Sequence, residues 1–214
     1  MIIKYMGHSF FTFTTENGTV IATDPYGAFC QYPNRSIRAD ICTISHHHSD
    51  HDGLSSIQGA PLVLDQAGAY RTEADIRIKA IPTQHDDQHG ALRGNNLFFV
   101  LEAEGLRIGH AGDLGHLVTA EQQKQIGPLD LLFLPVGGYY TLDAQTALCV
   151  QKRLSPKVTI PMHYKTAYSK EMPIAEVDGY VALTGLHCTP MPLLRIAKED
   201  VSERESVIVL AVEA

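Results

Sequence analysis

The sequence predicts an α/β fold in which two mixed β-sheets pack together and are flanked by helices. Hairpins with turns at Asn17-Gly18 and Glu104-Gly105 dominate the early part of the chain. Strands and helices alternate later, and this order is typical of layered α/β folds. At 214 residues, the chain is expected to form a single domain, residues 1–214, with a substantial core.

The first part of the chain is predicted to be mainly β. Apolar and hydroxyl residues alternate over 11–14, and the β-branched run 19–22 completes the first hairpin. Residues 41–45 are apolar enough for a buried strand, and a short helix is expected to start at Leu54. Residues 26–38 show no periodicity, so we expect a loop that borders a cleft.

Later elements are marked by clear boundary signals. Thr119 and Gln122 fit a helix capping box, and Gly127-Pro128 ends that helix. Pro82 is expected to close a strand over 76–81. Further helices are expected at 143–154 and 174–183, and further strands at 61–65, 96–101, 106–109, 129–134, 157–160, 193–196 and 207–212.

Composition excludes several classes of protein. Hydrophobic content of 44% and charged content of 19% indicate a globular chain. The net charge is −7 and there is no Lys/Arg block, so no nucleic-acid partner is expected. No signal peptide or membrane span is recognised, and the four cysteines lack C-x-x-C spacing, which favours reduced thiols in the cytoplasm. Assembly into a homo-oligomer is left open.

The densest chemical signal is the hexad His46-His47-His48-Ser49-Asp50-His51. It follows the predicted strand 41–45 and supplies several imidazoles and a carboxylate within one loop. That donor set suits zinc, iron or manganese. A solvated polar turn or an adventitious nickel-binding patch is the alternative, but such a dense group favours a metal site.

Three distant residues share the placement of the hexad. His85, Asp113 and His163 each stand just past a predicted strand. Strand ends at one edge of stacked sheets converge in space, so these residues and the hexad are expected to form one site. Taken singly, each would more often be a surface, core or turn residue. Their combination predicts a dinuclear metal centre.

The pattern His46-x-His48-x-Asp50-His51, followed by His85, Gly112-Asp113 and His163, resembles the signature of the metallo-β-lactamase superfamily. The resemblance covers about residues 7–166 and implies a four-layer αββα sandwich. Further stretches resemble a compact branch that includes ascorbate-6-phosphate lactonase-like and N-acyl-phosphatidylethanolamine phospholipase D-like hydrolases. These stretches are Gly7-His8-Ser9, Thr23-Asp24-Pro25, His110-Ala111-Gly112-Asp113, Pro135-Val136-Gly137-Gly138 and Ile160-Pro161-Met162-His163-Tyr164.

The resemblance implies a catalytic arrangement. Two divalent ions, zinc in preference to Mn²⁺ or Fe²⁺, share a hydroxide that attacks a small ester, lactone or phosphoester substrate. Asp50 and Asp113 are the residues expected to take part in catalysis, and Asp50 could also orient the attacking water. The implied ligands are His46, His48 and His85 for one ion, Asp50, His51 and His163 for the other, and Asp113 as the bridge.

Other residues are weaker candidates. Asp24 at a strand end could support a ligand, or could simply belong to an Asp-Pro turn. Lys165 could bind a substrate anion, or could be a solvated cation. Tyr140 could line the pocket or protonate a leaving group, or could be a packing residue. Among the remaining histidines, His116 and His89 are candidate acid or supporting groups, and His8 could support the site or simply fill a strand edge. His47 is expected to point away from the metals, and His110 and His187 receive no role.

Two other functions use the same ligands. An iron-dependent oxidoreductase on the same scaffold is the first alternative, and a metal-binding protein without turnover is the second. Retention of all seven ligands favours hydrolysis. The substrate itself is not readable from the sequence, although loops 25–38 and 86–95 are expected to determine specificity.

Overall fold

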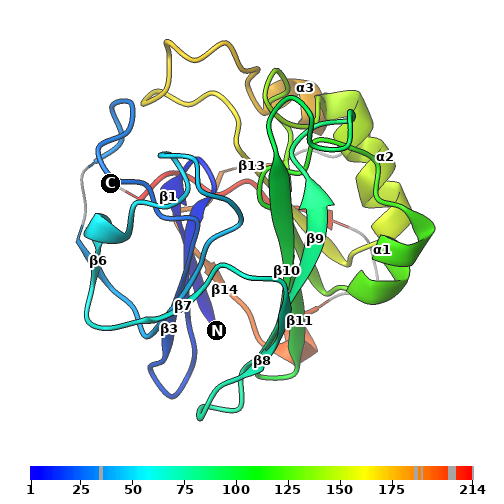
Figure 1. Ribbon diagram of the computed structural model, residues 1–214. Coiled ribbons are helices and arrows are strands. Elements are labelled where there is room, and N and C mark those ends of the chain that lie inside the picture. The colour runs from blue at the N-terminus through cyan, green and yellow to red at the C-terminus, as the bar shows by residue number, and fades with distance from the viewer. Residues whose placement is uncertain (34–35, 186–187, 189, 202–205, 214) are drawn as a thin grey trace.

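Two β-sheets stacked face to face form the centre of the protein (Figure 1). The α/β sandwich predicted from the sequence is therefore confirmed. The computed structural model describes residues 1–33, 36–185, 188, 190–201 and 206–213. His187, which received no role from the sequence, lies outside the described residues.

The first sheet is mixed. Its antiparallel part is built from β14, β1, β2 and β3, and β5 and β7 continue it in parallel with β3. Strand β1, which begins at the second residue of the chain, pairs with the edge strand β14 on one side and with β2 on the other. In sheet order the strands are β14 (Leu194–Arg195), β1 (Ile2–Gly7), β2 (Phe10–Thr14), β3 (Val20–Thr23), β5 (Ile41–Thr43) and β7 (Leu62–Leu64).

The second sheet brings the ends of distant strands to one edge. Strands β9 and β11 both run antiparallel to β10, and β11, β12 and β13 are parallel. Strands β9, β11 and β13 therefore end at the same edge of the sheet. In sheet order the strands are β15 (Ser206–Val207), β13 (Val158–Met162), β12 (Leu131–Pro135), β11 (Leu106–His110), β10 (Asn95–Ala103), β9 (Arg77–Gln84) and β8 (Gly68–Arg71).

The main core lies between the sheets. Phe11 and Phe13, two positions apart on β2, point toward the second sheet as the alternation over 11–14 predicts. Both rings contact Phe133 of β12 edge to face, with centroids 4.5 and 5.2 Å apart. This aromatic contact fixes β2 against β12, and so fixes the strand ends of the two sheets relative to each other.

The three α-helices among the described residues lie on the outer side of the seven-stranded sheet (Figure 1). They are α1 (Ala120–Ile126), α2 (Ala144–Leu154) and α3 (Asp178–Thr184). The capping box of Thr119 and Gln122 is present, and Gly127 ends α1 as expected. No helix in the described part of the chain is long and apolar enough to cross a membrane.

In the described part of the chain, the outer face of the six-stranded sheet is covered by segments without an α-helix. A second, smaller core contains Tyr26, Tyr32 and Cys42 and lies beneath them. The covering segments include the 3₁₀ helices and short strands β4 (Ile37–Arg38), η1 (Leu54–Ser56) and β6 (Ile57–Gln58), while η2 (Lys198–Asp200) lies near the end of the chain. The helix expected at Leu54 is thus a single 3₁₀ turn.

Several predicted boundaries are wrong for identifiable reasons. Strand β9 continues through Pro82 to Gln84 because β8 pairs only as far as Ala80, so the missing N–H of Pro82 faces no strand. The expected strand 207–212 is limited to Ser206–Val207 and two isolated bridges. Strand β8 was not expected, since its sequence lacks an apolar alternation.

Candidate metal centre

The predicted site residues all lie just past strand ends. His46, His48, Asp50 and His51 occupy the loop that follows β5, and His85 comes directly after β9. Asp113 follows β11 by three residues, and His163 directly follows β13. Because β9, β11 and β13 end at one edge, their three residues meet the hexad loop of the other sheet.

Three imidazoles form a first group. The ring centroids of His46 and His48 are 4.5 Å apart, and those of His46 and His85 are 4.8 Å apart. One nitrogen from each of these three residues lies within 4.8 Å of the others, which is close enough to hold one ion. His48 is the exposed member, so the group opens to solvent on its side.

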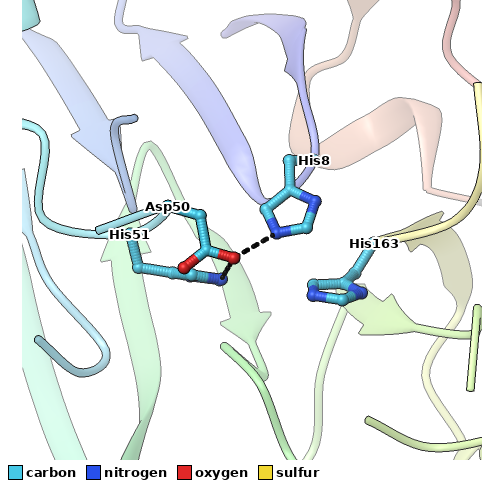
Figure 2. Close-up of side chains that lie close together, drawn as sticks. All are labelled: His8, Asp50, His51 and His163. Carbon is cyan, nitrogen blue, oxygen red and sulfur yellow. Dashed lines mark hydrogen bonds and ion pairs between the residues drawn. The ribbon is translucent and has the colours of Figure 1, made fainter. Parts of the chain in front are cut away.

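A second group contains Asp50, His51, His163 and one residue outside the expected ligand set, His8 (Figure 2). His8 Nε2 lies 3.1 Å from Asp50 Oδ2, and the rings of His8 and His163 are 4.0 Å apart. Burial lowers the pKa of His8 to about 4, so its ring is neutral. The sequence offered only its place after Gly7 at a strand end, which left the role of His8 undecided.

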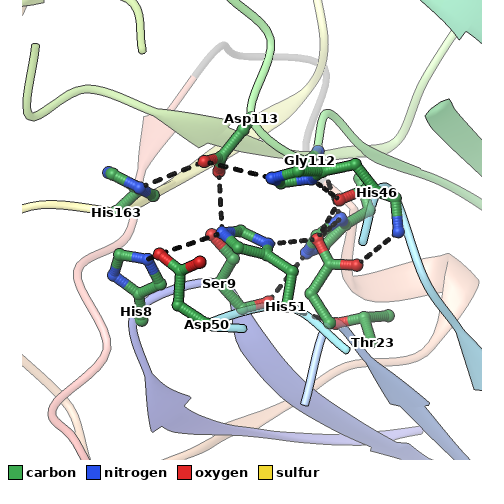
Figure 3. A network of polar contacts seen from close by, with 12 residues as sticks. His8, Ser9, Thr23, His46, Asp50, His51, Gly112, Asp113 and His163 are labelled. Atoms are coloured by element: carbon green, nitrogen blue, oxygen red, sulfur yellow. Dashed lines mark hydrogen bonds and ion pairs between the residues drawn. The ribbon is translucent and has the colours of Figure 1, made fainter. Parts of the chain in front are cut away.

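Asp113 connects the two groups (Figure 3). Its Oδ2 lies 3.1 Å from His85 Nε2 and 3.3 Å from His163 Nε2, and its Oδ1 lies 3.2 Å from His51 Nε2. Burial alone would raise the pKa of Asp113, but the imidazoles of His163 and His51 hold it well below its usual range. The carboxylate is therefore ionised, buried and central to the cluster.

Asp24 orients two of the imidazoles. The Ser45 hydroxyl donates to Asp24 Oδ2 over 2.6 Å and, having no second proton, accepts from His46 Nδ1 at 3.0 Å. His51 Nδ1 donates to the same oxygen over 3.0 Å. With Nδ1 engaged in this network, the Nε2 atom of each ring faces Asp113 and is the atom that a bound metal ion would meet. Asp24 therefore makes contacts that an Asp-Pro turn does not require.

The donor atoms fit a metal ion. His46 Nε2, His51 Nε2 and Asp113 Oδ1 are buried without a hydrogen bond to any described residue. One ligand atom from each of these residues lies within 4.8 Å of the others. Buried polar atoms are nearly always satisfied, and imidazole with carboxylate is a ligand set for zinc or iron. The arrangement therefore matches a metal centre better than a packed polar core.

Gly112 is required where the chain approaches the hexad. It has a φ of +55°, and a Cβ at this position would lie 2.5 Å from Ser45 Cβ and 2.4 Å from Asn96 Oδ1. Asn96 Oδ1 also accepts from the Asp113 amide over 2.9 Å. Only glycine lets Asp113 be held this close to the Ser45–Asp24 network.

A cleft of about 510 Å³ opens over the cluster. Besides the proposed ligands, it receives side chains from the two loops that were expected to determine specificity. The residues that line it are Phe29, His48, Ser49, Asp50, His85, Leu92, Arg93, Asp113, Tyr140, His163 and Met172. The sequence singled out Tyr140, but no motif pointed to Phe29, Leu92, Arg93 or Met172.

Other candidates lie outside this lining. Lys165 is half-buried, and its backbone amide pairs with Ala175. Both ring nitrogens of His116 are engaged, one by the Gln84 amide and the other by the Leu117 carbonyl. His89 is exposed, and the side chain of His47 is 60% exposed and faces acidic residues outside the cluster. None of the four is among the residues that line the cleft.

Comparison with known proteins identifies the family to which the chain belongs. The chain belongs to the family of the beta-lactamase superfamily domain, whose sequence model matches residues 2–163. The match confirms the resemblance to the metallo-β-lactamase superfamily that the histidine motif indicates. Within that superfamily, the protein is an enzyme of the metal-dependent hydrolase class.

Particular relatives cover nearly the whole chain. A UPF0173 metal-dependent hydrolase of Thermoplasma acidophilum is 28% identical over 209 residues, 86% of this chain and 90% of that protein. One from Pelotomaculum thermopropionicum is 29% identical over 196 residues, 78% and 85% of the two chains. A crystal structure from Thermotoga maritima, assigned as a Zn-dependent hydrolase of the metallo-beta-lactamase superfamily, is 36% identical with a TM-score of 0.80 and covers 97% of each chain.

Proposed function

We propose that this enzyme uses two divalent metal ions, with zinc favoured by the donor set, to hydrolyse a small ester, lactone or phosphoester. The observation that carries the proposal is the convergence of three chain segments, the hexad loop and the segments of His85 and His163, on the buried carboxylate of Asp113. The proposed ligands are His46, His48 and His85 for one ion, Asp50, His51 and His163 for the other, and Asp113 for both.

When bound, two divalent ions would lower the pKa of a water molecule toward neutrality and offset the negative charge that develops on the substrate. The contribution of the protein is to orient the side chains that would hold these ions. Asp24 and Ser45 keep His46 and His51 in the tautomer that presents Nε2, and ligands held in this way need little reorganisation during turnover.

Asp50 is the ligand carboxylate that is more open to the cleft. Its side chain is 23% exposed, whereas that of Asp113 is 2% exposed. Burial opposes ionisation of Asp50, but the hydrogen bond with His8 and the charge of His51 hold its pKa well below the usual range. We propose that Asp50 accepts a hydrogen bond from the attacking water, and that His8 fixes the direction of the carboxylate.

Tyr140 is proposed to serve the leaving group. It is half-buried, lines the cleft and carries the only phenol among the described lining residues. A phenol at this place can donate a hydrogen bond to the departing oxygen. A cleft of about 510 Å³ suits a small molecule rather than a polymer, in agreement with the acidic composition.

The test is turnover of a panel of carboxylic esters, lactones, phosphodiesters and thioesters by protein with measured metal content. We expect hydrolysis of at least one class by metal-loaded protein and a loss of about 1,000-fold or more in Asp113→Ala. His47→Ala is the matched control, because His47 lies in the same loop but outside the cluster. Metal-free protein with full turnover would contradict the proposal.

An oxygen-uptake measurement on the same protein separates hydrolysis from iron-dependent oxidation. Oxygen consumption by iron-loaded protein, with no hydrolysis by the zinc form, would replace the proposal with the oxidoreductase alternative. Absence of both reactions in protein with full metal content would favour a binding role.

A further inference from the structure

Arg93 places a positive charge at the cleft without an acidic partner. Its Nη2 donates to the Tyr139 carbonyl over 3.0 Å, and its guanidinium carbon lies 5.8 Å from the centroid of the Tyr140 ring. No carboxylate of the described residues forms an ion pair with it. A guanidinium carries five N–H donors, so most of those of Arg93 remain available.

The backbone holds Arg93 at a fixed place relative to the proposed metal ligand His85. The His85 amide donates to the Gly94 carbonyl over 3.0 Å and closes the base of the loop between β9 and β10. Inside the loop, Asp86 accepts backbone hydrogen bonds of 2.7 to 2.9 Å from four amides. The donors are Gln88, Gly90, Leu92 and Arg93.

The carboxylates of the cleft do not neutralise the charge of Arg93. The two carboxylates that line the cleft, Asp50 and Asp113, lie against the imidazoles of the cluster. Arg93 is the single Lys or Arg side chain among the described lining residues. A partly desolvated guanidinium with free donors is a recognition element for a carboxylate or a phosphate.

The rest of the lining is apolar at several points. Phe29 and Leu92 come from the two loops at the cleft, and Met172 comes from a third segment. Leu92 is 69% exposed, so its apolar side chain is open to contact with a ligand. The cleft thus combines a metal centre, one cation and an apolar border.

We propose that Arg93 binds an anionic group of the substrate, a carboxylate or a phosphate, while the scissile ester, lactone or phosphoester group reaches the metal centre. The substrate class is accordingly a small anion with an apolar portion. This inference rests on the proposed function, since it assumes a reacting group at the metal centre. The ring of Tyr140 contacts the guanidinium by a cation–π interaction.

The test begins with binding, which needs no turnover. Zinc-loaded protein is titrated by calorimetry with adipate and with hexanoate, which differ by one carboxylate. Wild-type protein is expected to prefer adipate by roughly 10- to 100-fold, a range typical of a charge-assisted hydrogen-bonded pair. Titration with 5-phosphonopentanoate shows whether a phosphonate replaces the second carboxylate.

Variants of Arg93 test whether this residue causes the preference for adipate over hexanoate. Arg93→Gln is expected to abolish the adipate preference, and Arg93→Lys to retain part of it, because a lysine keeps the charge without the fork of donors. Arg195→Gln is the control, since Arg195 is exposed and pairs with Ile2 at the opposite end of β1 from His8. Thermal melting of each variant verifies folding.

Kinetics supply the second measurement. Mono-4-nitrophenyl adipate and its neutral methyl ester are compared as substrates, and Arg93→Gln is expected to lower kcat/KM for the anionic ester alone. The role of Arg93 is overturned if kcat/KM is equal for the anionic and the neutral ester, or if the adipate preference is unchanged in Arg93→Gln. An Arg93-dependent adipate preference without turnover of any substrate supports the anion site and counts against hydrolysis.

Discussion

The carboxylate of Asp24 lies 3.0 Å from Nδ1 of His51, although the two residues are 27 positions apart and both are completely buried. Burial opposes a charge on Asp24, but the hydrogen bond and the charge of His51 lower its pKa. An ionised carboxylate behind a metal-binding imidazole strengthens the opposite nitrogen as a ligand. Asp24 therefore links the first sheet to the metal centre without occupying it.

Substitution of Asp24 should weaken metal binding rather than remove it. We expect Asp24→Asn to reduce zinc affinity by roughly 10- to 100-fold, because His51 and Ser45 lose a charged acceptor. The affinity is measured by competition with a chromophoric chelator. Asp65→Asn is the control, since the single ion pair of Asp65 within the described residues is with the exposed His47. Equal affinity in the two variants would show that Asp24 has no part in orienting the ligands.

Alanine substitutions of the neighbouring His47 and His48 should have very different effects on metal content. His48→Ala should lose about one equivalent of bound metal, because His48 supplies one of the three imidazoles of its group. His47→Ala should keep the full content, because its ring faces Asp52 and Asp65. Elemental analysis by mass spectrometry after dialysis measures both, and equal losses would contradict the assignment of the hexad.

Gly137 should not tolerate a methyl group. A Cβ there would lie 2.2 Å from the His163 carbonyl oxygen and 3.0 Å from Tyr164 Cα, both backbone atoms. We expect Gly137→Ala to reduce the free energy of unfolding by about 1–3 kcal/mol and to lower metal content by displacing His163.

Gly179→Ala is the control for this backbone effect. Gly179 lies within α3 with nothing within 4 Å of the added Cβ, so the substitution should be neutral or stabilise the helix by up to about 1 kcal/mol. Urea unfolding of both variants gives the comparison. If the Gly137→Ala protein were as stable as the Gly179→Ala protein, the segment that follows β12 would have to move away from His163 without cost.

His110 should make stability depend on pH. Burial lowers the pKa of this imidazole, whose Nε2 donates to the Ser9 carbonyl and whose Nδ1 accepts from the Gly112 amide. The unfolded chain then binds more protons than the folded one below the ordinary pKa of about 6.5. The contribution of neutral His110 is therefore complete above that pH and is lost as pH falls toward the folded pKa.

The measurement compares wild type with His110→Gln, which keeps a donor and an acceptor. The difference between their free energies of unfolding should shrink as pH falls from about 8 to about 5.5. A difference that stays constant over this range would show that His110 does not titrate on unfolding.

The sequence predicted the architecture because its signals are local. Alternation over 11–14, the capping box at Thr119 and the buried run 129–134 depend on neighbouring residues, and the elements formed where expected. The strand through Pro82 could not be predicted, because its tolerance depends on how far β8 extends beside it. Pairing partners decide such cases, and they are distant in sequence.

The candidate site likewise contains some residues that the sequence could predict and others that it could not. The hexad, His85, Asp113 and His163 could be proposed because each follows a strand and carries a metal-binding group. His8 and Arg93 could not be assigned, since their contacts with Asp50 and Tyr140 join loops that are far apart in the sequence. A lone arginine in a polar loop carries no signal that separates a substrate contact from a solvated charge.

The loop gathered around Asp86 has a consequence for how enzymes of this design can diversify. Its shape depends on main-chain amides, whereas the side chains of Asp87, Gln88, His89 and Ala91 are exposed. Replacing those side chains would alter the surface of the loop while the Asp86 carboxylate and the neighbouring imidazole of His85 keep their positions. New preferences could thus be acquired, in nature or by grafting, without rebuilding the catalytic machinery.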